Sequence, residues 1–146
     1  MFKLLSDLST VQRKEIPLSS LTANVYVSGY SGSWVTLDGS GYATLTSAET
    51  GLAWLVWNES NRNGTQGWSP DVKNAMSVSV FFGKVRGYTD QYSGSPTLGS
   101  VMYTTTGGKI TPGVIGTNQV VAVCRKAPFS YVQFGTTFTV IEIETV

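Results

Sequence analysis

Histidine is absent from this chain of 146 residues, and cysteine occurs only once, as Cys124. Acid–base or nucleophilic catalysis at neutral pH generally needs a positioned base, and that base is most often histidine. Without histidine, Ser-His-Asp and Cys-His arrangements are impossible, and the common histidine-containing zinc sites are excluded. The sequence therefore predicts no catalytic residues, no metal site and no cofactor, and its single cysteine excludes an intramolecular disulfide.

Clustered carboxylates are also missing. Two carboxylates that converge in space could hydrolyse a glycoside. The acidic residues of the central region, however, all fall in or beside predicted turns: Asp38, Glu49, Glu59, Asp71 and Asp90. Turn chemistry and solubility explain their positions, so we expect a protein that is not an enzyme.

Charge is scarce as well. Asp, Glu, Lys and Arg make up 13% of the chain, whereas about 25% is usual. The net charge is +1, and the ten basic residues form no patch that could neutralise phosphates. We therefore expect no nucleic-acid partner. A surface of hydroxyl groups and glycine suits packing against identical copies or a larger assembly, and it also suits a stable extracellular β-protein.

Long apolar runs are absent. The first residues lack the apolar core of a signal peptide, and no later run approaches the length needed to span a bilayer. The sequence therefore predicts a chain made in the cytoplasm with no membrane partner.

Short runs rich in Val, Thr and aromatic residues, separated by turn residues, fill most of the chain and indicate strands. The runs are residues 24–27, 33–37, 42–46, 52–57, 76–80, 100–104, 119–125, 131–134 and 137–145. Asp38-Gly39 between two of them predicts a hairpin. Alternation places Met76, Val78 and Val80 on one buried face. Cys124 follows an apolar run and is expected to be buried.

The final run has apolar residues on both faces, since Phe138 and Val140 point one way while Ile141 and Ile143 point the other. A strand of this kind fits a small barrel better than a one-sided sheet. The fold class expected is all-β, a small β-barrel or sandwich of short antiparallel strands.

Residues 1–22 differ from the rest and are interpreted as an N-terminal arm, with residues 23–146 forming a single all-β domain. Leu4, Leu8 and Val11 have helical spacing and would share one face of a short amphipathic helix. With Phe2 and Leu5 they form a candidate partner-binding surface. On this hypothesis, removing residues 1–15 leaves the domain folded. The alternative is a segment folded back on its own domain.

A second candidate site lies in the polar stretch of residues 58–71 and the strand before it. Trp57, Asn61, Arg62 and Trp68 could contact a ligand there. Exposed indoles stack on sugar rings, and amides hydrogen-bond to sugar hydroxyls. Indoles also commonly form the rim of a core or a protein contact, and both interpretations remain open.

The last third of the chain carries a resemblance. A strand leads into Gly107-Gly108-Lys109-Ile110-Thr111-Pro112-Gly113, residues 120–124 follow as an apolar strand, and residues 138–143 form the closing strand. This order resembles the β-barrel cement, or decoration, proteins on the outside of tailed-phage capsids. Residues 1–22 and 52–68 have no counterpart in that family.

The resemblance implies a virion structural protein on the capsid surface, made in the host cytoplasm. Its partner would be the major capsid protein, and its contacts would reinforce the junctions between capsid subunits. It would act as a homo-oligomer, a trimer, without a cofactor. The alternative is a carbohydrate-binding module of a phage tail or fibre.

Overall fold

The structure, a computed structural model, describes residues 2–17, 32–47, 52–56, 77–113, 119–133 and 135–146. These residues are mostly in strands, and the helices among them are single 3-10 turns. The prediction of an all-β fold is confirmed. The predicted strand at residues 24–27 lies outside the described residues.

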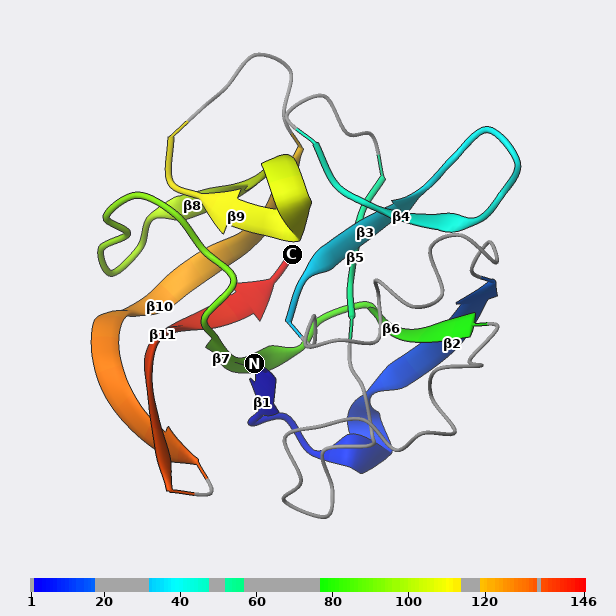
Figure 1. The fold of residues 1–146 in the computed structure, drawn as a ribbon. Coiled ribbons are helices and arrows are strands. Elements are labelled where there is room, and N and C mark those ends of the chain that lie inside the picture. The colour runs from blue at the N-terminus through cyan, green and yellow to red at the C-terminus, as the bar shows by residue number, and fades with distance from the viewer. Residues whose placement is uncertain (1, 18–31, 48–51, 57–76, 114–118, 134) are drawn as a thin grey trace.

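The described elements follow one another along the chain as shown in Figure 1. They are β1 (Phe2–Leu4), η1 (Leu8–Thr10), β2 (Gln12–Pro17), β3 (Trp34–Leu37), β4 (Ala43–Leu45), β5 (Trp54–Leu55), β6 (Ser77–Phe82), β7 (Arg86–Thr89), β8 (Val101–Thr105), η4 (Thr106–Gly108), β9 (Lys109–Thr111), β10 (Val120–Gln133) and β11 (Thr136–Thr145).

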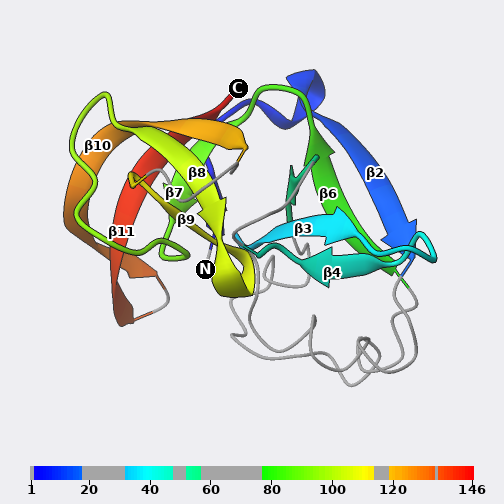
Figure 2. The same ribbon diagram turned by 90° about the horizontal axis from the view of Figure 1, so that it is seen from above.

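The described strands form three antiparallel sheets. The largest has the order β1-β7-β11-β10-β8-β9, and the others are β2-β6 and β4-β3-β5. Both views place β7–β11 on one side of the molecule and β2, β3, β4 and β6 on the other (Figures 1 and 2). The first strand of the chain is therefore an edge of the sheet that also holds the last strand.

Two apolar cores lie between these sheets. The first contains Phe2, Trp34 and Phe81 together with Ile141 and Ile143 of β11. The second is smaller and lies between β2-β6 and the three-stranded sheet, around buried residues Ile16, Val35, Ala43, Val56, Val78 and Val80.

Strands β3 and β6 contribute to both cores. In β3, Trp34 packs in the first core and its neighbour Val35 packs in the second. In β6, Phe81 packs in the first core and its neighbour Val80 packs in the second. Successive side chains of a strand point to opposite faces, so a strand between two cores must be apolar at consecutive positions. This explains why Phe81-Phe82 follows the alternating residues 76–80. The strand continues through Phe82, and the chain bends at Gly83, which has φ +89°.

The predicted hairpin at Asp38-Gly39 is present. Asp38 Oδ1 accepts hydrogen bonds from the backbone N–H of Ser40 (2.8 Å) and Tyr42 (2.9 Å), and it thereby closes the loop between β3 and β4. The positive φ belongs to Gly41 (+82°) rather than to Gly39. The turn is therefore longer than a two-residue hairpin.

The prediction of a short amphipathic helix at the N-terminus is wrong. Leu4 ends β1, Leu8 begins η1, and Val11 precedes β2, so their helical spacing is not used. β1 pairs with β7, and the chain turns at Asp7, whose carboxylate accepts a hydrogen bond from the N–H of Ser9 (2.9 Å). Pairing with a strand distant in sequence overrides the local helical period.

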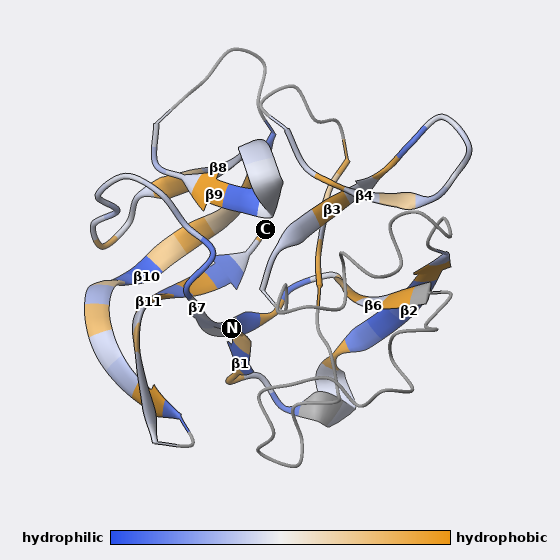
Figure 3. Cartoon of the chain, in the orientation of Figure 1, coloured by the Kyte–Doolittle hydropathy of each residue, from blue (hydrophilic) through white to orange (hydrophobic). Residues whose placement is uncertain are grey.

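The expectation that residues 1–22 form a free arm is also wrong for the described part of that segment, residues 2–17, because its strands pair with the domain. β2 pairs with β6 over its whole length, from Gln12 opposite Phe82 to Pro17 opposite Ser77. Figure 3 shows β2 as mostly hydrophilic and β6 as mostly hydrophobic, and in β2 only Ile16 is buried. The segment is folded back on its own domain, which was the alternative.

The strands predicted at residues 119–125 and 131–134 are one long strand, β10. Its pairing with β11 shifts register between Cys124 and Lys126 and again between Lys126 and Phe129. Pro128 lies in this irregular part and is exposed. At this position β10 pairs with β11 alone, so its other side is an edge of the sheet. A proline at a bulge of an edge strand loses no ladder hydrogen bond, and the strand therefore continues past Pro128.

Candidate functional site

A hollow of about 200 Å³ lies where β5 and β6 meet the C-terminal end of the chain. Apolar side chains make up most of its lining, among them Trp34, Leu52, Trp54, Phe82, Val120 and Val146. Phe82 is 47% exposed and Val146 is 61% exposed. The hollow therefore opens between apolar side chains that solvent reaches.

Hydrogen bonds fix the wall formed by the C-terminus. Thr145 Oγ1 donates to the carbonyl of Gly83 (2.9 Å) and accepts from the N–H of Val85 (2.8 Å). The N–H of Val146 donates to the carbonyl of Val121 (3.1 Å). Thr145 and Val146 are thus held at the rim of the hollow by the connection between β6 and β7 and by β10, both of which are distant in sequence.

Trp34 lies at the inner side of the hollow. Its side chain is buried, and its Nε1–H has no hydrogen-bond acceptor in the described structure. Among the described residues, the other polar side-chain groups lining the hollow are the indole N–H of Trp54, the amide of Gln119 and the hydroxyl of Thr145. This arrangement can hold an apolar or aromatic group, but it offers no base or nucleophile for chemistry.

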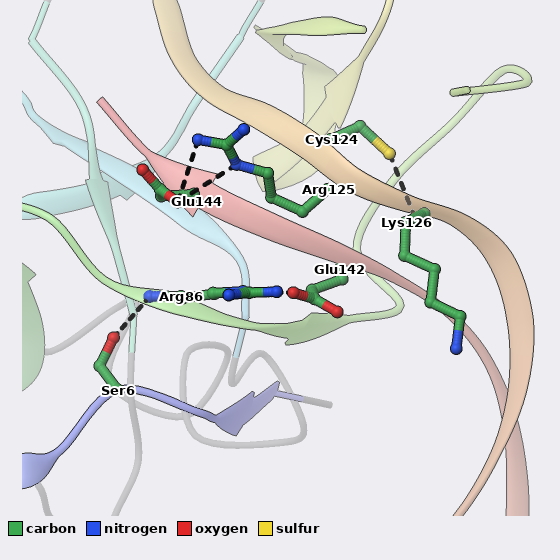
Figure 4. Close-up of polar contacts among 7 residues, drawn as sticks. All are labelled: Ser6, Arg86, Cys124, Arg125, Lys126, Glu142 and Glu144. Atoms are coloured by element: carbon green, nitrogen blue, oxygen red, sulfur yellow. Dashed lines mark hydrogen bonds and ion pairs between the residues drawn. The ribbon is translucent and has the colours of Figure 1, made fainter. Parts of the chain in front are cut away.

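Two ion pairs join strands of the largest sheet (Figure 4). Arg86 pairs with Glu142, whose side chain is only 8% exposed. Arg125 pairs with Glu144 at 3.1 Å, and the hydrogen bond from Arg125 lowers the pKa of the Glu144 carboxyl. Both carboxylates are held in structural contacts.

Aromatic rings continue this face beyond the ion pairs. The ring of Tyr88 packs edge-on against Phe129, with centroids 5.0 Å apart, and against Tyr131, at 5.3 Å. The ammonium group of Lys126 lies 4.0 Å from the centroid of Phe129. These contacts fix the curvature of β10 over β7.

Carboxylates elsewhere in the described chain also have local roles. Asp38 closes a turn, and Asp90 accepts a hydrogen bond from the amide of Gln91 at 2.7 Å. The described residues contain no group of three His, Cys, Asp or Glu side chains placed to hold a metal ion. None of the described helices has the length and hydrophobicity needed to cross a membrane.

The candidate residues of the N-terminal segment do not form one surface. Phe2 is 5% exposed and packs in the first core, and Leu4 and Val11 pack partly against it. Leu5 is exposed, and Leu8 is described only as the start of η1. The prediction that Phe2 contributes to a partner-binding surface is therefore wrong, because its ring is buried in the chain's own first core.

Trp57, Asn61, Arg62 and Trp68 lie outside the described residues. Trp54, three positions before Trp57, is described and is half-buried at the hollow. The sequence did not indicate that Phe82 and Val146 would line the same hollow as Trp54. Phe81 and Phe82 are adjacent in the strand and therefore point to opposite faces, which could have indicated that one of them faces away from the first core. No local pattern indicates where Val146 lies.

The search for similar proteins finds no matching family model, no matching curated protein and no matching solved structure.

Cys124 provides a test of the first core. It is fully buried, as predicted, and its thiol donates to the carbonyl of Lys126 at 3.2 Å. Burial raises the pKa of the Cys124 thiol, and the charge of Glu142 raises it further. Because only the thiolate is nucleophilic, we expect the native protein to react with Ellman's reagent far more slowly than the protein in guanidinium chloride. Equal rates in the two states would contradict this packing.

Proposed function

We propose that this protein is a virion structural protein that binds the outside of a phage capsid and reinforces contacts between major capsid subunits. Its partners are the major capsid protein and further copies of itself, as a homotrimer. The proposal comes from the resemblance carried by residues 107–113, 120–124 and 138–143. The fold agrees with it in class, since both are all-β.

The observation that carries the proposal is the placement of these three segments in one sheet. Residues 107–113 include the end of η4 and all of β9, residues 120–124 begin β10, and residues 138–143 lie in β11. The sheet order β11-β10-β8-β9 brings them together through the strand that precedes the turn. The turn and strand order of the resemblance thus corresponds to one contiguous unit of structure.

The surface supports the same proposal. The carboxylates described above are engaged in turns and ion pairs, and the hollow offers no reactive group. Large apolar side chains are nevertheless exposed, including Leu98 at 73%. Exposed apolar side chains that form a contiguous patch are typical of a surface that contacts another macromolecule.

The hollow beside Trp54 favours the alternative of a carbohydrate-binding module of a phage tail or fibre. An indole at the mouth of a hollow is a suitable platform for a sugar ring. The mostly apolar lining, however, contains few groups that could hydrogen-bond to sugar hydroxyls.

Copurification with particles tests the proposal. We expect the chain to be present in purified particles of the phage that encodes it, in a fixed ratio to the major capsid protein, as measured by quantitative mass spectrometry. It should be absent from isolated tails. Particles that lack the chain would overturn the proposal. Sugar binding on a glycan array that is lost in Trp54→Ala would support the alternative instead.

A further inference from the structure

The hairpin formed by β10 and β11 extends beyond its neighbours in the sheet. β8 pairs with β10 only at Val120–Val123, and β7 pairs with β11 only at Ile141–Glu144. β10 and β11 continue to pair with each other as far as Gln133 opposite Thr136. Figures 1 and 2 show this distal part curving away from the rest of the molecule. Within the described structure, no third strand pairs with it.

Charged residues are found at the base of the hairpin, and the part that extends beyond the sheet has none. Arg125, Lys126, Glu142 and Glu144 lie together at its base (Figure 4). Residues 127–141, between them in sequence, contain no charged residue and are rich in Thr, Val and aromatic residues. Val132 in this segment is 62% exposed. The projecting part of the hairpin is thus an uncharged, β-forming segment in contact with solvent.

The hairpin presents its edges in a defined shape. Tyr88 packs against Phe129 and Tyr131, and the two register shifts in β10 set the bend. Little conformational freedom remains to be lost when a partner binds, so binding is favoured.

A projecting two-stranded hairpin has unpaired backbone N–H and C=O groups along both outer edges, and these groups pair readily with another strand. Natural proteins usually protect such edges with lysine, proline or a covering segment. Residues 127–141 contain no lysine and one proline, Pro128, and the nearest lysine is Lys126 at the base, whose ammonium group lies 4.0 Å from the ring centroid of Phe129. The edges around Val132 and Thr137 are therefore open to pairing.

We propose that this hairpin is an interface between copies of the chain, in which an edge strand of one copy pairs with the hairpin of another. An identical copy is the occupant because an uncharged edge does not repel itself and every copy displays the same edge. Since the hairpin has two edges, β10 of one copy can pair with β11 of the next, and such head-to-tail contacts form a ring when the rotation between copies closes. The inference concerns self-association and does not depend on the capsid proposal.

Lysine at the centre of the edge tests the inference. We expect the wild-type protein to sediment as an oligomer at tens of micromolar, and Val132→Lys to raise its dissociation constant about tenfold or more, since lysine on an edge strand opposes pairing. Val132→Thr, which keeps the β-branched shape without the charge, should associate like the wild type. Hydrogen exchange should show that the outward-facing backbone amides of residues 129–139, those that do not bond across the hairpin, are protected in the oligomer and lose this protection in Val132→Lys.

Thr137, the cross-strand partner of Val132, provides a second variant. If circular dichroism shows that Val132→Lys does not fold, Thr137→Lys on β11 decides the question by the same measurements. A monomeric wild type, or an oligomer unaffected by the lysine variants, would overturn the inference. Because these experiments use isolated protein, self-association without capsid binding would overturn only the capsid part of the proposed function. Capsid binding by a strict monomer would overturn this inference and the homotrimer part of that proposal, and it would leave capsid binding itself in place.

Discussion

Replacing Gly108 by alanine is expected to lower the free energy of unfolding by about 2–5 kcal/mol. Gly108 ends η4 and has φ +74°, a conformation that costs other residues about 1–2 kcal/mol. A Cβ there would also lie 2.7 Å from a methyl carbon of Leu45 and 3.1 Å from the backbone oxygen of Trp34. Leu45 can move, but the backbone of β3 cannot without disturbing both cores. Chemical denaturation monitored by tryptophan fluorescence measures the change.

Gly107 is the matched control. It has nearly the same backbone conformation, φ +76°, but an added Cβ would have no atom within 4 Å. Gly107→Ala should therefore cost only the conformational part, about 1–2 kcal/mol. Equal losses for the two variants would show that the contact of Gly108 with β3 and β4 is not close enough to matter.

Removal of residues 1–15 is expected to prevent stable folding. The deletion removes β1, most of β2 and the ring of Phe2, which packs against Phe81 at a centroid distance of 5.6 Å. Loss of a buried phenylalanine side chain alone costs about 3–5 kcal/mol, whereas the whole free energy of unfolding of a domain is about 5–15 kcal/mol. This reverses the expectation from sequence that the remaining domain would fold without these residues. Circular dichroism and thermal unfolding of the truncated chain measure the effect.

Two single substitutions separate packing from strand loss. Phe2→Ala should destabilise by about 3–5 kcal/mol, because the ring is buried against Gly87, where an added Cβ would lie 2.3 Å from Cζ of Phe2. Leu5→Ala, at an exposed position, should change stability by less than about 0.5 kcal/mol. A truncated chain that unfolds at the wild-type temperature would restore the hypothesis of a free arm.

Several features of the fold were predictable from sequence because they depend on neighbouring residues. The alternation of Val78 and Val80 places both on a buried face, and the carboxylate of Asp38 closes its own turn. The burial of Cys124 follows from the apolar run that precedes it. Each of these depends on a period of two residues or on a contact within four positions.

The tertiary structure alone decided the fate of the N-terminal segment. Leu4, Leu8 and Val11 carry a helical spacing, yet a helix of two turns gains little by itself. A strand of three residues gains more here, because Gly87 on β7 leaves room for the Phe2 ring. No local pattern indicates that position 87 will lie beside position 4.

The hollow and the projecting hairpin also could not be predicted from the sequence. Trp34, Phe82 and Val146 meet only after the sheets have packed, and β10 extends past β8 only because β8 ends its pairing at Val101 opposite Val123. Strand propensity indicates which residues extend, since it arises within the strand itself. Whether a strand is paired, covered or left open depends on partners far away in the chain, and that choice is made by the free energy of packing the whole molecule.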